Sequence, residues 1–453
     1  MERKREATDL GSRAGWAEVD CTPPLGLPMG GRGTRFTPGG EILDPLYLQA
    51  LLLRDAEGKH LLLITIDMIG LSADMSTRFR GELAAQTGVS PAHILLNFSH
   101  THSGPMSGFE GYATHQRKPA EMIAYEEDLL EKACAAARSA LADMQPVRVS
   151  CHRGQSHIGI NRRGRTPEGD MGMRPNSDGH YNPELWVLDI AGHDGRRCVL
   201  FSYGCHPVIV YGYAWDCLSA DFPGVCRGVL CQALGPKVQT QFIQGLAGNI
   251  RPRLLANLEK GCFERGTAES TAAVGRTLAE DVLRALQLEG VHLKPDIRIA
   301  STWIMVERDQ QAWPLSHWET MGQSEDEMQQ ALGQYWLERY VEGPPPVCST
   351  PWEVGLIQLA PGHRIAFFSG EALAEWLPQL RRWLADRDLV AWGYCQDGRC
   401  YRPTDAHLAE GGYEVVQSNF YNQSGPGPFR PGIDKKVERT FRELERAIKR
   451  ECE

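Results

Sequence analysis

Two histidine motifs are the strongest chemical signals in the sequence. In ILLNFSHTHSGP an apolar run gives way to His100 and His102 and then to a Ser-Gly-Pro turn, and in VLFSYGCHPVIV His206 stands beside a proline between apolar runs. In an extended chain His100 and His102 point the same way, so one can bind a metal while the other faces a substrate. A neutral imidazole at a rigid strand end is a common zinc ligand. The two motifs therefore predict a metal site.

A structural role for these histidines is the alternative. A single histidine on an apolar strand is more often a hydrogen-bonded core residue, and His206 taken alone fits that role better. Two imidazoles side by side in a polar turn are harder to explain by packing, so the HTH motif favours chemistry. Spacing alone leaves both interpretations open.

The elements that must position these motifs alternate between strands and helices. Short runs rich in Val, Ile and Leu are typical of buried strands, and segments with helical spacing separate them. Strands are expected at 48–54, 61–66, 94–98, 186–190, 198–203, 238–243, 299–306, 355–359, 365–369 and 390–394. Helices are expected at 74–86, 122–144, 223–234, 267–288, 324–342, 371–386 and 433–451. We therefore predict a mixed α/β (α+β) fold in which mixed β-sheets are flanked by helices.

Two segments interrupt this pattern. The segment 163–184 is rich in Gly, Pro, Arg and Asn and has no apolar period, so it should be an exposed loop. The sequence GPPPV at 343–347 is a second interruption. Neither requires a domain boundary, so we expect residues 1–453 to form a single domain, with residues 1–13 disordered.

Three local patterns carry narrower expectations. Pro378 should kink the helix expected at 371–386 or lie near its first turns. The charged residues of 433–451 are spaced as helical neighbours, which predicts a solvated surface helix. Cys395 and Cys400 bracket CQDGRC, where a hairpin turn is favoured over a metal knuckle because no second cysteine pair follows at zinc-ribbon spacing.

Composition restricts the partner. The chain is 42% hydrophobic and 23% charged, and its formal charge of -9 gives no electrostatic footprint for nucleic acid or an anionic membrane. The N-terminus has no apolar core of a signal peptide, and the apolar stretch at 61–71 is about half the length that a membrane-spanning helix needs. The thirteen cysteines are scattered in mostly apolar context, which favours reduced thiols. We expect a soluble cytoplasmic protein that binds a small molecule, not a membrane or nucleic acid; the oligomeric state stays open.

Six motifs, taken in order, resemble the neutral, non-lysosomal ceramidases. They are NFSHTHSGP, GCHPV, SADFPG at 219–224, QGLAGNIRP at 244–252, SGE at 369–371 and GGYE at 411–414. The opening GWAEVDCTPPLGLPMGGRG is also similar, and the resemblance covers nearly the whole chain. It implies the fold of the catalytic, N-terminal domain of that family.

The resemblance also implies one zinc ion per chain, bound by His100, His206, Glu371 and Tyr413. Two imidazoles, a carboxylate and a phenol oxygen form a mixed nitrogen and oxygen site that suits zinc and leaves a position for water. From the residues alone, Glu371 could equally be a helix N-terminal acid favoured by the macrodipole, and Tyr413 a packing residue.

One departure from the family changes the expected chemistry. Ceramidases carry a serine nucleophile in a Gly-Asp-x-Ser-Pro block, but this chain has Gly248-Asn249-Ile250-Arg251-Pro252, so Arg251 stands in the serine's place. A guanidinium is no nucleophile, but its planar fork of donors suits a carboxylate, a phosphate or a developing oxyanion. The chain also ends soon after the motifs, so we expect neither the family's C-terminal immunoglobulin-like domain nor ceramidase activity itself.

The predicted reaction is metal-assisted hydrolysis of an amide or other acyl bond in a small polar, anionic or sugar-like substrate. A zinc-activated water would attack, His102 would move the proton, and Arg251 and Asn249 would hold the substrate and its oxyanion. Isomerisation, elimination or cyclisation of a polar sugar-like or carboxylate substrate at the same zinc is the alternative. A binding protein without activity ranks last because all four ligands are present.

Further polar residues could support this chemistry. Four are candidates for substrate binding, with a charged surface turn or an ion pair as the alternative: Asn161, Arg162, Arg163 and Arg253. Two acids could orient a zinc-bound imidazole, namely Asp221 and Asp67. Asp221 could instead cap a helix, which requires less of the surrounding structure.

Overall fold

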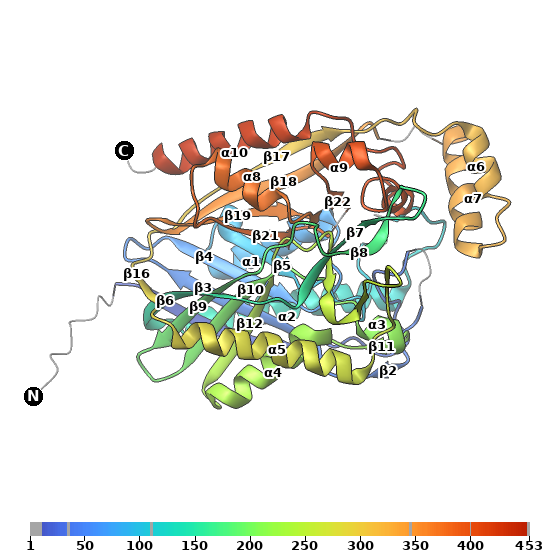
Figure 1. The fold of residues 1–453 in the computed structure, drawn as a ribbon. Coiled ribbons are helices and arrows are strands. Elements are labelled where there is room, and N and C mark those ends of the chain that lie inside the picture. The colour runs from blue at the N-terminus through green and yellow to red at the C-terminus, as the bar shows by residue number, and fades with distance from the viewer. Residues whose placement is uncertain (1–10, 34–36, 109–111, 344–346, 399, 451–453) are drawn as a thin grey trace, which may run out of the picture.

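A computed structural model describes residues 11–33, 37–108, 112–343, 347–398 and 400–450 (Figure 1). Its largest element is a 13-stranded sheet in which most neighbouring strands are antiparallel, while β4–β5, β19–β21 and β10–β12 are parallel. The strand order is β12 (Val238–Gln244), β10 (Arg197–Tyr203), β9 (Glu184–Gly192), β6 (Gln145–Gln155), β1 (Arg13–Asp20), β3 (Tyr47–Arg54), β4 (His60–Ile66), β5 (Ile94–Phe98), β21 (Val390–Cys395), β19 (His363–Ser369), β18 (Ser349–Ala360) and β17 (Arg298–Glu307), with β16 (Val291–Leu293) beside β6. This mixed sheet confirms the predicted fold class.

The large sheet folds back on itself, so that its two halves face each other. A bridge between Gly245 and Trp392 joins the end of β12 to β21, although the two strands are far apart in the sheet order. The apolar run of β4 explains the packing: Leu61 and Leu63 point into the core between the halves, whereas Leu62 and its alternate neighbours point to the opposite face. A strand buried on both faces must be apolar along its whole length.

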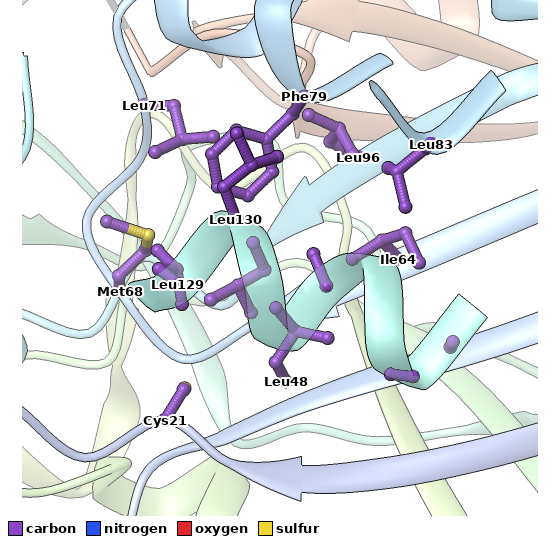
Figure 2. Packing of buried hydrophobic residues seen from close by; sticks show 14 of the residues in the cluster. Cys21, Leu48, Ile64, Met68, Leu71, Phe79, Leu83, Leu96, Leu129 and Leu130 are labelled. Carbon is purple, nitrogen blue, oxygen red and sulfur yellow. The ribbon is translucent and has the colours of Figure 1, made fainter. Parts of the chain in front are cut away.

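Helices cover the outer faces. α1 (Ala73–Thr87) and α2 (Ala120–Ala142) pack on β1, β3 and β5, and Figure 2 shows this layer, where Leu129 and Leu130 meet Phe79, Leu48 and Ile64. α4 (Asp221–Leu234) and α5 (Ala268–Gln287) cover β6, β9 and β12. α10 (Ile433–Arg450) covers β17 and β18 and also contacts α8 (Trp376–Trp383). Among the described residues no helix is both long and apolar enough to cross a membrane.

Two sequence predictions about the helices were wrong in part. The helix expected at 371–386 is only α8, because its first residues form the short strand β20 (Glu371–Ala372), which pairs with β22 (Tyr401–Arg402); Pro378 lies in the first turn of α8, as expected. The helix at 433–450 is not fully solvated, since Val437, Phe441 and Leu444 on one face are buried.

The exposed loop predicted at 163–184 is instead largely a hairpin. β7 (Gly159–Arg165) pairs with β8 (Met171–Asn176) on one side and with β13 (Ile250–Pro252) on the other. Arg163 is buried in it because its guanidinium is paired with acids, which the composition of the segment does not reveal. Residues 1–10 of the segment predicted to be disordered lie outside the described residues, but Arg13 begins β1.

Shorter elements surround the strand ends. α6 (Leu315–Met321) and α7 (Glu327–Val341) form a helical pair at one edge of the molecule (Figure 1), where aromatic residues pack against the turn η4 (Gln417–Tyr421). α3 (Val210–Tyr213) follows β10, and α9 (Asp405–Glu410) precedes η4. The remaining pieces are η1 (Pro91–His93), η3 (Arg253–Leu255), β2 (Glu41–Ile42), β11 (Cys217–Leu218), β14 (Ala256–Asn257) and β15 (Cys262–Phe263). None of the described cysteines is joined to another in a disulfide.

Candidate metal centre

His100 is held in position by backbone on both sides of its ring. It follows the end of β5 with a positive φ of 63°, a conformation that a non-glycine residue adopts at some cost. Its backbone N–H donates to Met68 O at 3.0 Å, and its Nδ1 lies 2.7 Å from Ile69 O. A carbonyl oxygen only accepts, so the proton of the neutral ring sits on Nδ1 and Nε2 carries a free lone pair.

His206 has the same arrangement on the neighbouring segment. Its Nδ1 lies 2.6 Å from Ala247 O, and its backbone N–H donates to Ile250 O at 3.0 Å. The side chain is fully buried. Its Nε2 is therefore also a lone-pair donor to a metal, with the tautomer set by a backbone carbonyl.

Glu371 brings a carboxylate to these two nitrogens. Its Oε2 lies 3.1 Å from His206 Nε2 and 3.3 Å from His100 Nε2. Ligands of a tetrahedral zinc ion with bonds of 2.0–2.1 Å are separated by about 3.3 Å, so these contacts match two edges of such a site. Glu371 lies on β20 and not in a helix, so the alternative role as a helix N-terminal acid is wrong.

The charge states agree with a site for a cation. Burial lowers the pKa of His206 to about 4, with the charge of Arg162 acting in the same direction. Burial alone would raise the pKa of the Glu371 carboxyl, but His100 and His206 lower it well below its ordinary value. With both Nδ1 atoms turned to backbone carbonyls, His100 Nε2, His206 Nε2 and Glu371 Oε2 face one point, an arrangement that a shared cation would stabilise.

His102 completes a histidine triad at this point. One ligand nitrogen from each of His100, His102 and His206 lies within 4.8 Å of the other two. The rings of His100 and His102 are 5.1 Å apart, and Tyr211 packs 5.5 Å from His102. Both nitrogens of the His102 ring are buried without a hydrogen-bond partner. Burial, followed by the neighbouring His100 and His206, lowers the pKa of His102 well below its ordinary value.

Three tyrosines surround the same point. Tyr401 is the register partner of Glu371 in the β20–β22 pair, and the ring of Tyr413 packs 5.8 Å from the ring of Tyr401. Both tyrosines line the pocket beside the histidines. Burial raises the pKa of Tyr413 and of Tyr401 above the ordinary range. Tyr394 packs 4.4 Å from the His100 ring, and its buried hydroxyl has no partner. The structure therefore offers Tyr401 beside Tyr413 as a candidate fourth ligand.

One glutamine links the two histidine segments. Gln244, at the end of β12, donates from Nε2 to Ser99 O and to Cys205 O, both at 2.9 Å, and accepts from the Cys205 N–H at 3.2 Å. Ser99 and Cys205 are the residues directly before His100 and His206. Gln244 itself is fully buried and is tied to β5 by Asn97, whose Oδ1 accepts its N–H at 2.9 Å. Because a rigid amide bonds both segments, it sets the separation of the two imidazoles.

The arginines predicted after HIGI are paired within the protein. Arg162 donates to Glu414 Oε1 at 2.8 Å and to the Tyr401 hydroxyl at 2.9 Å, and Arg163 donates to Glu414 Oε2 at 2.7 Å and to Glu410 at 3.0 Å. Burial would lower the pKa of Arg162, but Tyr401 and Glu414 raise it well above its ordinary value. These arginines fix the GGYE segment beside the metal site, so their predicted contact with substrate has no support in the geometry.

The two predicted asparagines are likewise engaged by protein groups. Asn249 donates to both oxygens of Glu375 at 3.0 and 2.8 Å and accepts from the Ala374 N–H at 3.0 Å. Asn161 donates to His180 O at 2.7 Å and accepts from the backbone of Arg163. Neither lines the main pocket. The predicted role of Asn249 in holding an oxyanion is therefore withdrawn in favour of a structural one.

The two acids expected to orient an imidazole do something else. Asp221 accepts from the N–H groups of Ile209 and Val210, both at 2.8 Å, and so caps the start of α3 rather than touching His206. Asp67 accepts from the Tyr47 N–H at 3.0 Å and pairs with Arg227. The prediction was wrong on this point, because the backbone carbonyls of Ile69 and Ala247 hold the rings instead, and a carbonyl leaves no signal in a sequence.

The remaining two predicted residues lie on β13 and directly after it. Arg251 packs with its guanidinium carbon 4.6 Å from the Phe263 ring and interacts with Tyr211, the neighbour of His102. Arg253 donates to Gly159 O at 3.2 Å and stacks 5.2 Å from Tyr181, away from the histidines. The structure thus brings Arg251, but not Arg253, toward the metal centre.

A pocket of about 820 Å³ including its open mouth leads to the histidines. The enclosed space within it is about 130 Å³, which is less than the roughly 300–1,000 Å³ typical of small-molecule sites. Among the described lining residues, His100, His102 and Glu371 form the base. Tyrosine side chains contribute much of the wall: Tyr112, Tyr401, Tyr413 and Tyr421. Such a wall combines apolar ring faces with hydroxyl groups, which suits a substrate that carries both.

This fold is the fold of the neutral ceramidases. The structure is similar to the crystal structure of the neutral ceramidase from Pseudomonas aeruginosa, with a TM-score of 0.68 and 17% identity over 92% of this chain and 72% of that chain. It is also similar to a ceramidase complexed with C2, with a TM-score of 0.66 and 17% identity over 92% of this chain and 73% of that chain. No protein-family model and no curated protein matches the sequence. The predicted fold is thereby confirmed.

Proposed function

We propose that this protein is a zinc-dependent hydrolase that cleaves an amide or other acyl bond in a small polar or anionic substrate. The observation that carries the proposal is the convergence of three lone pairs, from His100 Nε2, His206 Nε2 and Glu371 Oε2, with separations of 3.1 and 3.3 Å to the carboxylate oxygen. Their mixed nitrogen and oxygen chemistry suits zinc. The two similar structures are described as ceramidases, a name that denotes an enzyme acting on an amide bond. This supports the proposal that the present protein cleaves an amide or other acyl bond.

The chain's own residues perform the remaining steps. A bound zinc ion would supply a Lewis acid and lower the pKa of a coordinated water to near neutrality. His102 is neutral and lies beside the two ligand imidazoles with both ring nitrogens unpartnered, so it can accept a proton at the pocket base. The tyrosine wall positions the substrate. Arg251 replaces the serine of the family motif, which is why the attack is assigned to water and not to a side chain.

Metal analysis of the purified chain tests the centre. We expect about one zinc per chain, lost in His100→Ala and in His206→Ala, because each removes one of three convergent ligands. His157→Ala is the matched control, since that histidine contacts Tyr181 and stands apart from the triad. Full zinc occupancy in both site variants would defeat the proposal.

The fourth ligand can be assigned by a pair of single-atom changes. Tyr413 is the ligand implied by the ceramidase resemblance, and Tyr401 is the phenol that the β20–β22 register places beside Glu371. We expect Tyr413→Phe and Tyr401→Phe to differ in zinc affinity, with the true ligand losing roughly tenfold or more. Equal affinities in both variants and the wild type would show that neither phenol binds the metal.

The reaction type is tested in isotopically labelled water. Hydrolysis must place the oxygen of water in the acid product, so mass spectrometry of the product formed from a candidate amide or ester should show incorporation of the label. Turnover without incorporation would assign the centre to isomerisation, elimination or cyclisation instead.

A further inference from the structure

Two arginines near the candidate metal centre, the buried Arg32 and the partly buried Arg251, have no acidic partner in an ion pair among the described residues. Arg32 is 5% exposed; one of its nitrogens, Nη2, donates to His102 O at 3.0 Å, while its Nε and Nη1 are buried without a partner. Arg251 has a buried Nε without a partner, and Nη1 meets only the weak acceptor Met173 Sδ at 3.6 Å. No ion pair forms at either guanidinium within the described part of the chain.

One side chain, Tyr211, links the two arginines. Arg251 interacts with Tyr211, whose ring packs 5.5 Å from that of His102. Arg32 is held in place by stacking 4.4 Å above Trp215, which itself packs 5.7 Å from Tyr211. The cluster of Arg32, Arg251, Tyr211 and Trp215 therefore adjoins the metal-binding histidines through His102.

Such a cluster is costly for the protein alone. A buried charge is normally paired, because removing it from water without a partner is unfavourable. Burial lowers the pKa of Arg32 to about 10 and also lowers the pKa of Arg251, and this loss of solvation outweighs the opposing effect of Tyr211 on both groups and of Asp216 on Arg32. Arg162, at the same depth, has its charge compensated by Glu414. No described acid forms an ion pair with either guanidinium group, so an anion from outside the chain would complete the cluster.

We propose that Arg32 and Arg251, with the hydroxyl of Tyr211, bind an oxyanion, a carboxylate or phosphate group of the substrate, beside the metal centre. A planar guanidinium fork matches both groups in geometry. The role of this site in turnover rests on the proposed hydrolase function, since the site would place the scissile bond of an anionic substrate at the histidines. Binding itself can be measured without a metal.

The test uses the full chain carrying His206→Ala, so that no anion binds through a metal held by the triad. Titration calorimetry with sodium phosphate or sodium acetate, at an ionic strength kept constant with chloride, should detect one site per chain. Adding Arg251→Gln or Arg32→Gln should weaken the better anion about tenfold or more. Arg439→Gln is the matched control, because Arg439 is a 72% exposed surface residue, and it should leave the affinity unchanged.

The outcomes separate the possibilities. Tighter binding of phosphate assigns the site to a phosphate group, and tighter binding of acetate assigns it to a carboxylate. Absence of binding by both anions, or an affinity that neither arginine variant changes, would overturn the proposal. If Arg251→Gln does not fold, Arg251→Lys keeps the charge but loses the planar fork and should bind more weakly than the parent. A failed metal assay leaves this test intact, so the two proposals can fail independently.

Discussion

The two sides of the metal centre differ in how their charged groups are satisfied. On one side Glu414 bonds both Arg162 and Arg163, at 2.8 and 2.7 Å, and all three side chains are buried. On the other side neither Arg32 nor Arg251 forms an ion pair among the described residues. Arg32 Nε and Nη1 and Arg251 Nε are buried without a hydrogen-bond partner. The first side is a finished part of the fold, which holds the GGYE segment in place. The second side is incomplete without a ligand, so the difference separates the scaffold from the binding surface.

Removing the shared acid should produce the largest loss. Glu414→Gln leaves two buried guanidinium groups without a compensating charge, and we expect the free energy of unfolding to fall by about 3–5 kcal/mol. Urea denaturation followed by circular dichroism measures this. Glu410→Gln is the control, because Arg163 is the partner of Glu410 among the described ion pairs and the Glu410 side chain is 38% exposed, so about 0–1 kcal/mol is expected. Equal losses in both variants would mean that Glu414 is not the anchor of this side.

Gln244→Leu should have the next largest effect. It leaves Ser99 O and both backbone groups of Cys205 without their partner, which should cost about 2 kcal/mol of stability. The loss of the shared amide also frees the two histidine segments, so zinc affinity should fall roughly tenfold or more. Gln239→Leu, on the same strand but with an unpartnered amide nitrogen, should change neither property by much. Unchanged zinc affinity in Gln244→Leu would show that the segments hold their separation without it.

Arg251→Met tests the incomplete side and should act in the opposite direction. Without an anion, replacing a partly buried charge that has no acidic partner by an apolar side chain of similar length should leave stability unchanged or raise it by up to about 1 kcal/mol. Arg163→Met is the contrasting variant, since it takes a partner from Glu414 and Glu410 and should destabilise the chain. Denaturant curves of both proteins decide the question. A clear loss of stability in Arg251→Met would place Arg251 with the scaffold.

Tyr394→Phe should have the smallest effect on stability. The hydroxyl is buried and has no partner, so its removal should change the free energy of unfolding by no more than about 0.5 kcal/mol. Tyr203→Phe is the matched control, because its hydroxyl donates to Ser156 O at 2.9 Å and its loss should cost about 1 kcal/mol. Thermal unfolding compares the two. A large loss of stability in Tyr394→Phe would show that the hydroxyl has a hydrogen-bond partner and that Tyr394 belongs to the scaffold.

The sequence predicted the fold well wherever local pattern decides structure. Each of the expected strands is present, because a run such as 61–66 is apolar along its length and only a strand buried on both faces of a sheet accommodates that. The segment after Ser369 was misassigned, since SGEALAEW has the composition of a helix start. Glu371 instead pairs with Tyr401, thirty residues further along the chain, and such a pairing is invisible to local pattern.

The candidate site divides in the same way. The motifs around His100, His206 and Glu371 predicted these three residues as ligands through their resemblance to the ceramidase motifs, because spacing alone left a structural role open. The partners that fix them are different. Gln244 and Glu414 lie inside motifs visible in the sequence, but nothing in those motifs says which groups they contact.

The sequence by itself determined the apolar strands, the two histidine motifs at their ends and the presence of Arg251 between Ile250 and Pro252. Only the tertiary structure decided which side chains are satisfied, since that depends on contacts between segments hundreds of residues apart. Arg162 and Arg251 illustrate the reason. They lie on the paired strands β7 and β13, yet Arg162 has a carboxylate oxygen at 2.8 Å and Arg251 forms no ion pair among the described residues. Charge compensation is a property of the folded neighbourhood, and it distinguishes a structural arginine from a binding one.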